Sequence, residues 1–253
     1  MNEKDITSLL LPGTPATVRV FPLLASTNTT LREWAEKDAP HGAAVIAEAQ
    51  TAGRGRLGRS FASPEGAGLY MSVLLREPVA KEWSSLLTPF AAVAAAEAIE
   101  ALSGISVGIK WVNDLWIDQR KIAGILTEGA FSPDGELDYA IVGIGINLLP
   151  GCLPPELTGI AAAIGDFAPP PSREALAAAI LDRLLGDTAS LSTAAFLSEY
   201  RRRSVVLGRR VTARDGDRTL IGVAREISDD GSLLLETPEG AVSLRAGEVS
   251  IRM

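Results

Sequence analysis

The 253-residue sequence is poor in cysteine and histidine: it holds one cysteine, Cys152, and one histidine, His41. A single cysteine cannot form a disulfide within the chain, and the two residues cannot build a Cys/His zinc site. Cys152 lies in a loop rich in proline and glycine, with no base near it in sequence. An ordinary loop thiol is therefore favoured over a catalytic nucleophile.

Positive charge is also in short supply: 24 Lys and Arg stand against 31 Asp and Glu, a formal net charge of -7. This balance opposes general attraction to nucleic acid or to an anionic membrane, so any anion site must be local. The first residues are acidic where a signal peptide would be basic, and the alanine-rich stretch 91–98 is interrupted by Glu97. We expect a cytoplasmic protein in which 91–98 is a buried helix and not a membrane span.

Apolar periodicity predicts helices over 29–37, 88–102, 172–185 and 193–203. Thr88 is expected to cap the second, with Pro89 at its first position and Gly104 past its end, and Ser172 to cap the third. Strand-like runs occur at 43–47, 69–75, 108–111, 115–118, 122–127 and 139–147. Short turns between them predict an α+β fold with a mixed, largely antiparallel sheet flanked by helices.

From residue 205 the pattern changes to short strands separated by Asp-Gly and Glu-Gly turns, at 205–211, 219–227, 232–237, 241–246 and 248–253. Such a pattern is typical of a small β-barrel. We therefore expect two domains, 1–203 and 204–253. No Pro/Ser-rich linker marks the boundary, so the domains are expected to touch.

The most specific local feature is residues 53–59, GRGRLGR, in which three arginines alternate with glycines. Glycine lets the backbone approach a ligand, and guanidinium groups give paired hydrogen bonds to phosphate oxygens. A solvated basic loop is the commoner interpretation of such a stretch. The segment 53–59 matches neither a Walker loop nor the dinucleotide-binding fingerprint. The G-x-G at Gly143 and Gly145 lies within a strand and alone indicates only a close approach to the backbone.

Five segments in this order resemble the biotin protein ligases: Ser26-Thr27-Asn28; Gln50 with 53–59; 110–114 (KWVND); 121–126 (KIAGIL); and 143–147 (GIGIN). Together they are highly specific, and residues from about 205 resemble the SH3-like module of this family. The resemblance implies a catalytic domain of the class II synthetase-like, biotin/lipoate ligase type, followed by an SH3-like barrel.

The resemblance also implies an activity. The chain would adenylate biotin with ATP and Mg²⁺ to biotinyl-5'-AMP, then transfer biotin to a lysine of a biotin carboxyl carrier domain. Only 25 residues precede Ser26, so we expect the short form without an N-terminal DNA-binding domain and with no nucleic-acid partner. The expected state is monomer or homodimer.

Site residues follow from the same match. Lys121 and Arg56 would be catalytic, and Asp114 would hold ATP-bound Mg²⁺. Biotin or its adenylate would contact Ser26, Thr27, Asn28, Gln50, Arg54, Gly55, Arg56, Lys121 and Gly124, and ATP would contact Lys110, Asn113, Asp114 and Asn147. The same residues also have simpler interpretations: one of residues 26–28 could cap a helix, Lys121 could be an exposed turn lysine, and 113–114 could form a plain turn.

Two residues depart from the family pattern. Val112 replaces a usual proline, which should loosen that turn, and Phe61 replaces a common tryptophan, which removes an N–H donor near the loop. Two other functions compete with biotin ligation. A lipoate or other acyl ligase shares the chemistry, and a nonenzymatic interaction protein could bind peptides through the barrel. The barrel has no tryptophan or tyrosine for a proline-recognition groove, which disfavours the second.

Overall fold

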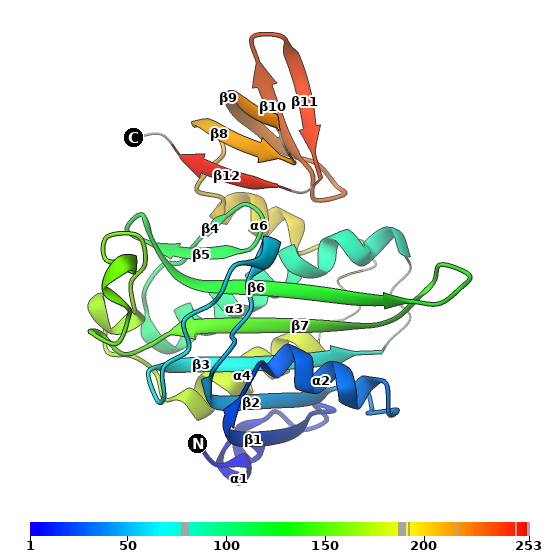
Figure 1. The fold of residues 1–253 in the computed structure, drawn as a ribbon, viewed down its shortest axis with the longest axis vertical. Coiled ribbons are helices and arrows are strands. Elements are labelled where there is room, and N and C mark those ends of the chain that lie inside the picture. Colours follow the sequence, from blue (N-terminus) through cyan, green and yellow to red (C-terminus); the bar gives the residue numbers. More distant parts are fainter. Residues whose placement is uncertain (77–80, 187–190, 192, 217, 246, 252–253) are drawn as a thin grey trace.

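The protein forms a larger α+β body and a smaller all-β part (Figure 1). The structure, a computed structural model, describes residues 1–76, 81–186, 191, 193–216, 218–245 and 247–251. The α+β class and the small C-terminal β domain predicted from the sequence are confirmed.

The larger body contains a seven-stranded sheet. Its spatial order is β1 (Thr17–Leu24), β2 (Ala43–Gln50), β3 (Gly68–Leu75), β7 (Leu137–Asn147), β6 (Arg120–Phe131), β5 (Asp114–Ile117) and β4 (Gly108–Lys110). The pair β1–β2 is parallel and the remaining pairs are antiparallel. The mixed, largely antiparallel sheet is therefore confirmed, and β1 is a strand that the sequence analysis did not predict.

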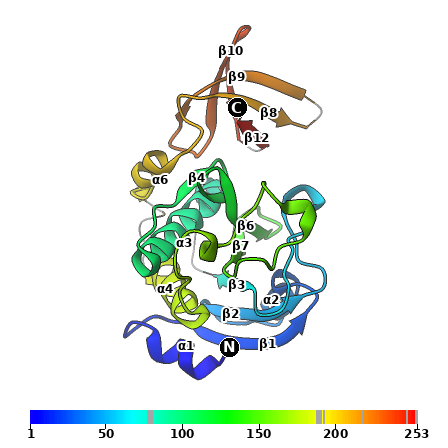
Figure 2. The same cartoon turned by 90° about the vertical axis from the view of Figure 1, so that its left-hand side faces the viewer.

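Helices cover the two faces of this sheet unequally (Figure 2). On one side, α3 (Leu87–Ser103) and α4 (Arg173–Gly186) pack in the main core, and α1 (Glu3–Leu9) packs on α4. On the other side, α2 (Thr27–Ala35) places Leu31 and Ala35 against Val45 and Ile141. Because α2 is short, it covers only part of its face and leaves the rest of β6 and β7 for a site.

Helix α3 is the buried helix expected at 91–98, but its start was predicted wrongly. It begins at Leu87 with Leu86 in the N-cap position, so Thr88 and Pro89 lie inside its first turn. The reason is that a 3-10 helix, Lys81–Leu86, runs directly into it. Gly104 ends the helix with φ 70°, as predicted. The stretch Ser84–Ser103 is long and apolar enough to span a membrane, yet 67% of its most apolar 18-residue window is buried inside the fold.

Two further helix predictions had different outcomes. Ser172 caps α4, since its hydroxyl accepts a hydrogen bond from the amide of Ala175 at 3.2 Å. The helix expected over 193–203 is shorter, because α6 runs only over Leu197–Arg203. Ala194 has φ 52°, which a continuous right-handed helix cannot contain.

The smaller part is a five-stranded antiparallel sheet in the order β11 (Gly240–Leu244), β10 (Leu233–Thr237), β9 (Arg218–Ile227), β8 (Arg210–Asp215) and β12 (Glu248–Ile251). The first predicted strand, 205–211, begins only at Arg210, because Arg209 donates its amide to the carbonyl of Val206 in a turn. Residues 246 and 252–253 of the predicted last two strands lie outside the described residues.

The two parts are in direct contact. The amide of Val205 donates to the carbonyl of Ile109 at 3.0 Å, just after α6 ends. The indole N–H of Trp111 donates to the carbonyl of Gly231, in the turn before β10, at 3.0 Å. The second bond joins the smaller sheet to the residue that precedes the 112–114 segment.

Candidate functional site

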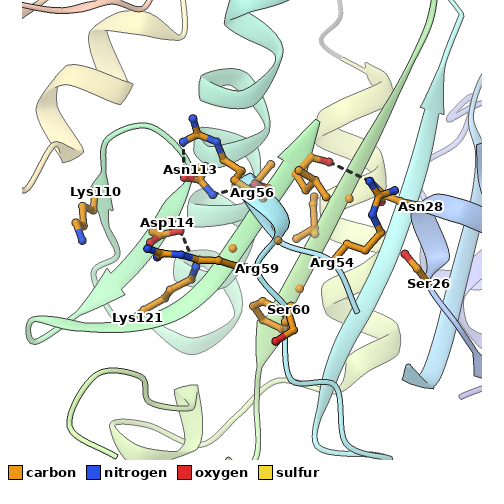
Figure 3. Close-up of a pocket in the computed structure, with 18 of the residues that line it drawn as sticks. Ser26, Asn28, Arg54, Arg56, Arg59, Ser60, Lys110, Asn113, Asp114 and Lys121 are labelled. Atoms are coloured by element: carbon orange, nitrogen blue, oxygen red, sulfur yellow. Dashed lines mark hydrogen bonds and ion pairs between the residues drawn. The ribbon is translucent and has the colours of Figure 1, made fainter. Parts of the chain in front are cut away.

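A cavity lies over the part of the sheet that α2 leaves uncovered (Figure 3). The loop 53–61 forms one wall, and Gly247, Val249 and Ser250 of the smaller sheet contribute to another. Every site residue predicted from the sequence lines it except Asn147: Ser26, Thr27, Asn28, Gln50, Arg54, Gly55, Arg56, Lys110, Asn113, Asp114, Lys121 and Gly124. Residues from five separate segments are thus brought to one place.

Glycines make the floor of the cavity into a trough. Gly124 on β6 pairs with Gly145 on β7, and Gly143 lies on the same face. A Cβ atom at Gly143 would stand 2.1 Å from the side-chain oxygen of Asn28, and one at Gly145 would stand 2.6 Å from the ring of Phe61. The close approach that the G-x-G predicted is confirmed.

One end of the trough is polar and is organised around Gln50. Its side-chain oxygen accepts a hydrogen bond from the amide of Thr27 at 2.8 Å, and its nitrogen donates to the hydroxyl of Ser63 at 2.8 Å. Gln50 therefore caps the first N–H of α2 from a neighbouring strand. Ser26 occupies the N-cap position but makes no side-chain cap bond. The simpler role considered for residues 26–28, capping of this helix by one of their side chains, was therefore wrong.

Asn28 lies beside this end and is held on three sides. Its oxygen accepts from the hydroxyl of Ser72 at 2.6 Å, and its nitrogen donates to Glu128 at 2.8 Å and to the carbonyl of Leu126 at 3.3 Å. The amide is 4% exposed and has a fixed orientation. Both N–H groups of the amide are used within the protein, so what it can offer a ligand is a lone pair of its oxygen in a fixed direction.

The other end of the trough is positively charged. The ammonium of Lys121 pairs with Asp114 at 2.7 Å, so Lys121 is not an isolated turn lysine. Arg56 donates to the side-chain oxygen of Asn113 at 3.1 Å, and Lys110 lies 4.6 Å from the centre of the Trp116 ring. Among the described residues that line the cavity, Asp114 is the only acid against three arginines and two lysines. Positive charge is therefore concentrated at this end of the trough, in a chain whose formal net charge is -7.

The Gly/Arg loop folds back on itself above the trough. The amide of Gly55 donates to the carbonyl of Arg59 at 2.7 Å, and the amide of Phe61 donates to that of Gly53 at 2.9 Å. Leu57 at its tip has φ 54° and is 74% exposed. Such a tip makes few contacts that would resist movement.

The segment before Asn113 is held from the far side. The buried hydroxyl of Tyr200 donates to the carbonyl of Val112 at 3.0 Å. Burial raises the pKa of Tyr200 far above its usual value, which keeps the hydroxyl protonated as a donor. The turn at Val112, expected to be loose, is tied to α6 by this bond.

Asn147 is not among the described residues that line the cavity. It is 7% exposed and donates its side-chain nitrogen to the carbonyl of Ala162 at 3.1 Å. Sequence reasoning also missed Ser63, Ser72 and Glu128, which hold the polar end in place. Ser72 had a usable signal, since it is the one small polar side chain within the apolar run 68–75.

Comparisons with known proteins find relatives over most of the chain. Residues 20–147 match the biotin/lipoate A/B protein ligase family, and residues 206–252 match the biotin protein ligase C terminal domain. The chain is 35% identical over 238 residues to the bifunctional ligase/repressor BirA of Bacillus subtilis, covering 90% of this chain and 72% of that protein. It is 33% identical to the biotin--[acetyl-CoA-carboxylase] ligase of Mycobacterium tuberculosis, covering 88% and 85%.

A solved structure has a similar fold over most of the chain. The biotin protein ligase from Aquifex aeolicus, in complex with biotin and ATP, superposes with a TM-score of 0.78 at 29% identity, covering 93% of this chain and 98% of that chain.

Proposed function

We infer that this chain, which belongs to the biotin/lipoate A/B protein ligase family, is a biotin--[biotin carboxyl-carrier protein] ligase. It uses ATP to activate biotin as biotinyl-5'-AMP and then attaches biotin to a lysine of a carrier protein. The observation that carries this is the glycine-floored trough. It has a polar end at Asn28 and Gln50, a cationic end at Lys121 and Arg56, and an arginine loop above.

In the first step, an oxygen of the biotin carboxylate attacks the α-phosphorus of ATP, and the bond to the β-phosphate breaks to release pyrophosphate. The polar ureido group of biotin fits the end at Asn28 and Gln50, and its carboxylate then points along Gly143 and Gly124 toward Lys121. Negative charge builds up on the phosphate oxygens in the transition state. Lys121 and Arg56 stabilise that charge because they are already placed at this end of the trough.

In the second step, the lysine amine of the carrier attacks the acyl carbon, the C–O bond to the phosphate breaks, and AMP leaves. The attacking amine loses a proton as the amide forms. The loop 53–61 lies over the trough and excludes water from the mixed anhydride. No covalent bond between the enzyme and biotin is needed.

The site would bind magnesium only together with the phosphates of ATP. Within the described part of the chain, no group of three His, Cys, Asp or Glu side chains gathers to hold a metal. Among the described residues that line the cavity, only Asp114 supplies a carboxylate, and Mg²⁺ is commonly held by one or two carboxylates plus substrate phosphates. Asp114 would bind the Mg²⁺ ion after its ion pair with Lys121 separates, and the ion would neutralise phosphate charge.

The remaining properties are part of the proposal. The acceptor is a biotin carboxyl carrier domain, the compartment is the cytoplasm, and the protein acts as a monomer or homodimer. Residues 1–203 form the catalytic domain and 204–253 the second domain. The net charge of -7 supports the absence of a nucleic-acid partner, and DNA binding at physiological salt would contradict it.

Pyrophosphate release tests the activation step. Purified protein with ATP and Mg²⁺ is assayed with biotin, with lipoate and with no acid, and an Arg56→Ala variant is assayed in parallel. We expect release that depends on biotin and falls at least about tenfold in the variant, since a charge-assisted contact contributes about 1.5–3 kcal/mol. Release with lipoate but not biotin would assign the chain to the other branch of the family, and release with neither would remove the enzymatic function.

A further inference from the structure

Glu128 is a carboxylate that the mechanism above does not use. It lies on β6, two and four residues beyond Leu126 and Gly124, so its side chain is on the same face of the sheet as the trough. It is not among the described cavity-lining residues. It lies directly behind two that are, Asn28 and Arg54, which occupy the same side of the cavity in Figure 3.

Three donor side chains, two from α2 and one from the loop, converge on this one carboxylate. Asn28 of α2 donates to Oε2 at 2.8 Å, and Arg32, one turn further along α2, donates to Oε1 at 2.6 Å. Arg54 of the loop donates to both oxygens, at 3.1 and 2.9 Å. The bidentate pair with Arg54 therefore attaches the arginine loop to Glu128, the same residue that orients the side-chain amide of Asn28.

The surroundings favour a charged Glu128. Its side chain is 17% exposed. Burial acts to raise the pKa of Glu128, but hydrogen bonds from Asn28 and Arg32 and the charges of Arg32 and Arg54 outweigh it, so the pKa is lowered. An ionised carboxylate accepts from all three donors at once, whereas a protonated one cannot.

We propose that Glu128 is a positioning residue of the ligase: it fixes the Asn28 amide below the trough and holds Arg54 above it, so that the loop spans the polar end before biotin arrives. This rests on the proposed function in taking biotin as the ligand. Pre-ordering both groups reduces the ordering cost of binding, so Glu128 sets the affinity for biotin and has little effect on ATP.

A Glu128→Gln variant tests this, because it keeps the shape but removes the charge and places an NH₂ group among three donors. The first readout uses no ligand: trypsin cleaves after arginine, so the rate of cutting at Arg56 and Arg59 reports how firmly the loop is held. We expect cutting to speed up roughly tenfold, the factor for losing one charge-assisted pair. The second readout is the calorimetric Kd for biotin without ATP, which should rise by a similar factor while the KM for ATP changes less than about threefold.

Glu136→Gln is the matched control. Glu136 is exposed near the turn that joins β6 to β7, on the same hairpin as Glu128, so the same chemical change there should alter neither readout. Thermal unfolding of both variants checks that they are folded. Should Glu128→Gln fail to fold, Arg54→Ala, on a loop side chain that is 42% exposed, replaces it, and cutting at Arg59 must then accelerate.

Two results overturn the proposal: a folded Glu128→Gln variant with unchanged cutting and unchanged biotin Kd, or one in which both substrate constants and the unfolding midpoint shift together. If the wild-type protein releases no pyrophosphate with biotin, the proposed function fails. The ligand-free cutting rates of Glu128→Gln and Glu136→Gln still decide whether Glu128 holds the loop.

Discussion

At the scale of single residues, the trough exists because side chains are missing from it. Gly143 faces Asn28 so closely that a methyl group would have to displace the amide from Ser72 and Glu128. Backbone glycines and polar side chains thus depend on one another. The shape of the site and its hydrogen bonds cannot be altered separately.

Gly143→Ala should therefore damage biotin binding selectively. A Cβ atom 2.1 Å from the Asn28 oxygen has no room, and overpacking a buried position costs about 1–3 kcal/mol. We expect the biotin Kd to rise at least about tenfold, while the KM for ATP is nearly unchanged. Gly186→Ala, where a Cβ atom meets nothing within 4 Å, is the control and should bind biotin normally. Equal biotin affinity in the two variants would contradict the geometry.

The sequence was informative about some of these residues and silent about others. Asn28 and Lys121 belong to short segments whose order and spacing resemble a family, so their roles could be predicted. Glu128 could not, because its partner Asn28 is 100 residues away and only the folded sheet brings them together. The cap of α2 was misassigned for the same reason, since Gln50 reaches it from β2.

At the scale of elements, the sequence predicted strands β2 to β7 of the larger sheet and missed β1. Strand β1 carries Pro22 and mixed polarity, and it is held as an edge strand by pairing with β2. Helix α6 is tied to the end of α3 by an ion pair of Arg203 with Glu100, at 2.6 Å. Arg203 is 7% exposed, so this pair joins two elements in a largely buried place.

The pair makes the junction of α3 and α6 sensitive to acid. The hydrogen bond from Arg203 is the main reason that the pKa of Glu100 lies below its usual 4.5. A carboxylate with a lowered folded-state pKa contributes stability above its unfolded pKa, and this contribution is lost as pH falls below about 4.5. Hydrogen bonds from Arg202 lower the pKa of the neighbouring Glu199 to about 2, so its contribution is lost progressively as the pH falls from about 4.5 to about 2.

Glu100→Gln should consequently lower the free energy of unfolding at pH 7 by about 1–3 kcal/mol, because Arg203 keeps a neutral acceptor but loses its counter-charge. The same variant should lose less stability than the wild type when the pH is lowered from 6 toward 3. Urea unfolding at several pH values measures both effects. Parallel curves for the two proteins would show that this pair does not carry the acid sensitivity.

At the scale of the whole molecule, the smaller sheet is part of the site. It contributes Gly247, Val249 and Ser250 to the cavity wall, and its turn at Gly231 accepts the indole N–H of Trp111. Trp111 lies two residues before Asn113 in the segment assigned to ATP. Trp111 therefore links the placement of the smaller sheet to the shape of the cavity end proposed to bind ATP.

Trp111→Phe should weaken this link without touching the polar end. The carbonyl of Gly231 would lose its partner in a buried place, at a cost of about 1–3 kcal/mol in unfolding free energy. We expect the KM for ATP to rise several-fold and the Kd for biotin to stay constant. Trp34→Phe, on a ring that packs against Phe21 on α2's side of the sheet, is the control. A matching rise in biotin Kd would show that the two ends of the trough are not separate.

The most direct test of the central claim is transfer of biotin to a carrier. The purified protein is incubated with ATP, Mg²⁺, biotin and a biotin carboxyl carrier domain, and the carrier is weighed by mass spectrometry beside a copy whose acceptor lysine is changed to arginine. We expect the gain of one biotin, through an amide bond, on the lysine-containing carrier alone and only with ATP. An unmodified carrier, in the presence of folded enzyme that binds both substrates, would contradict it.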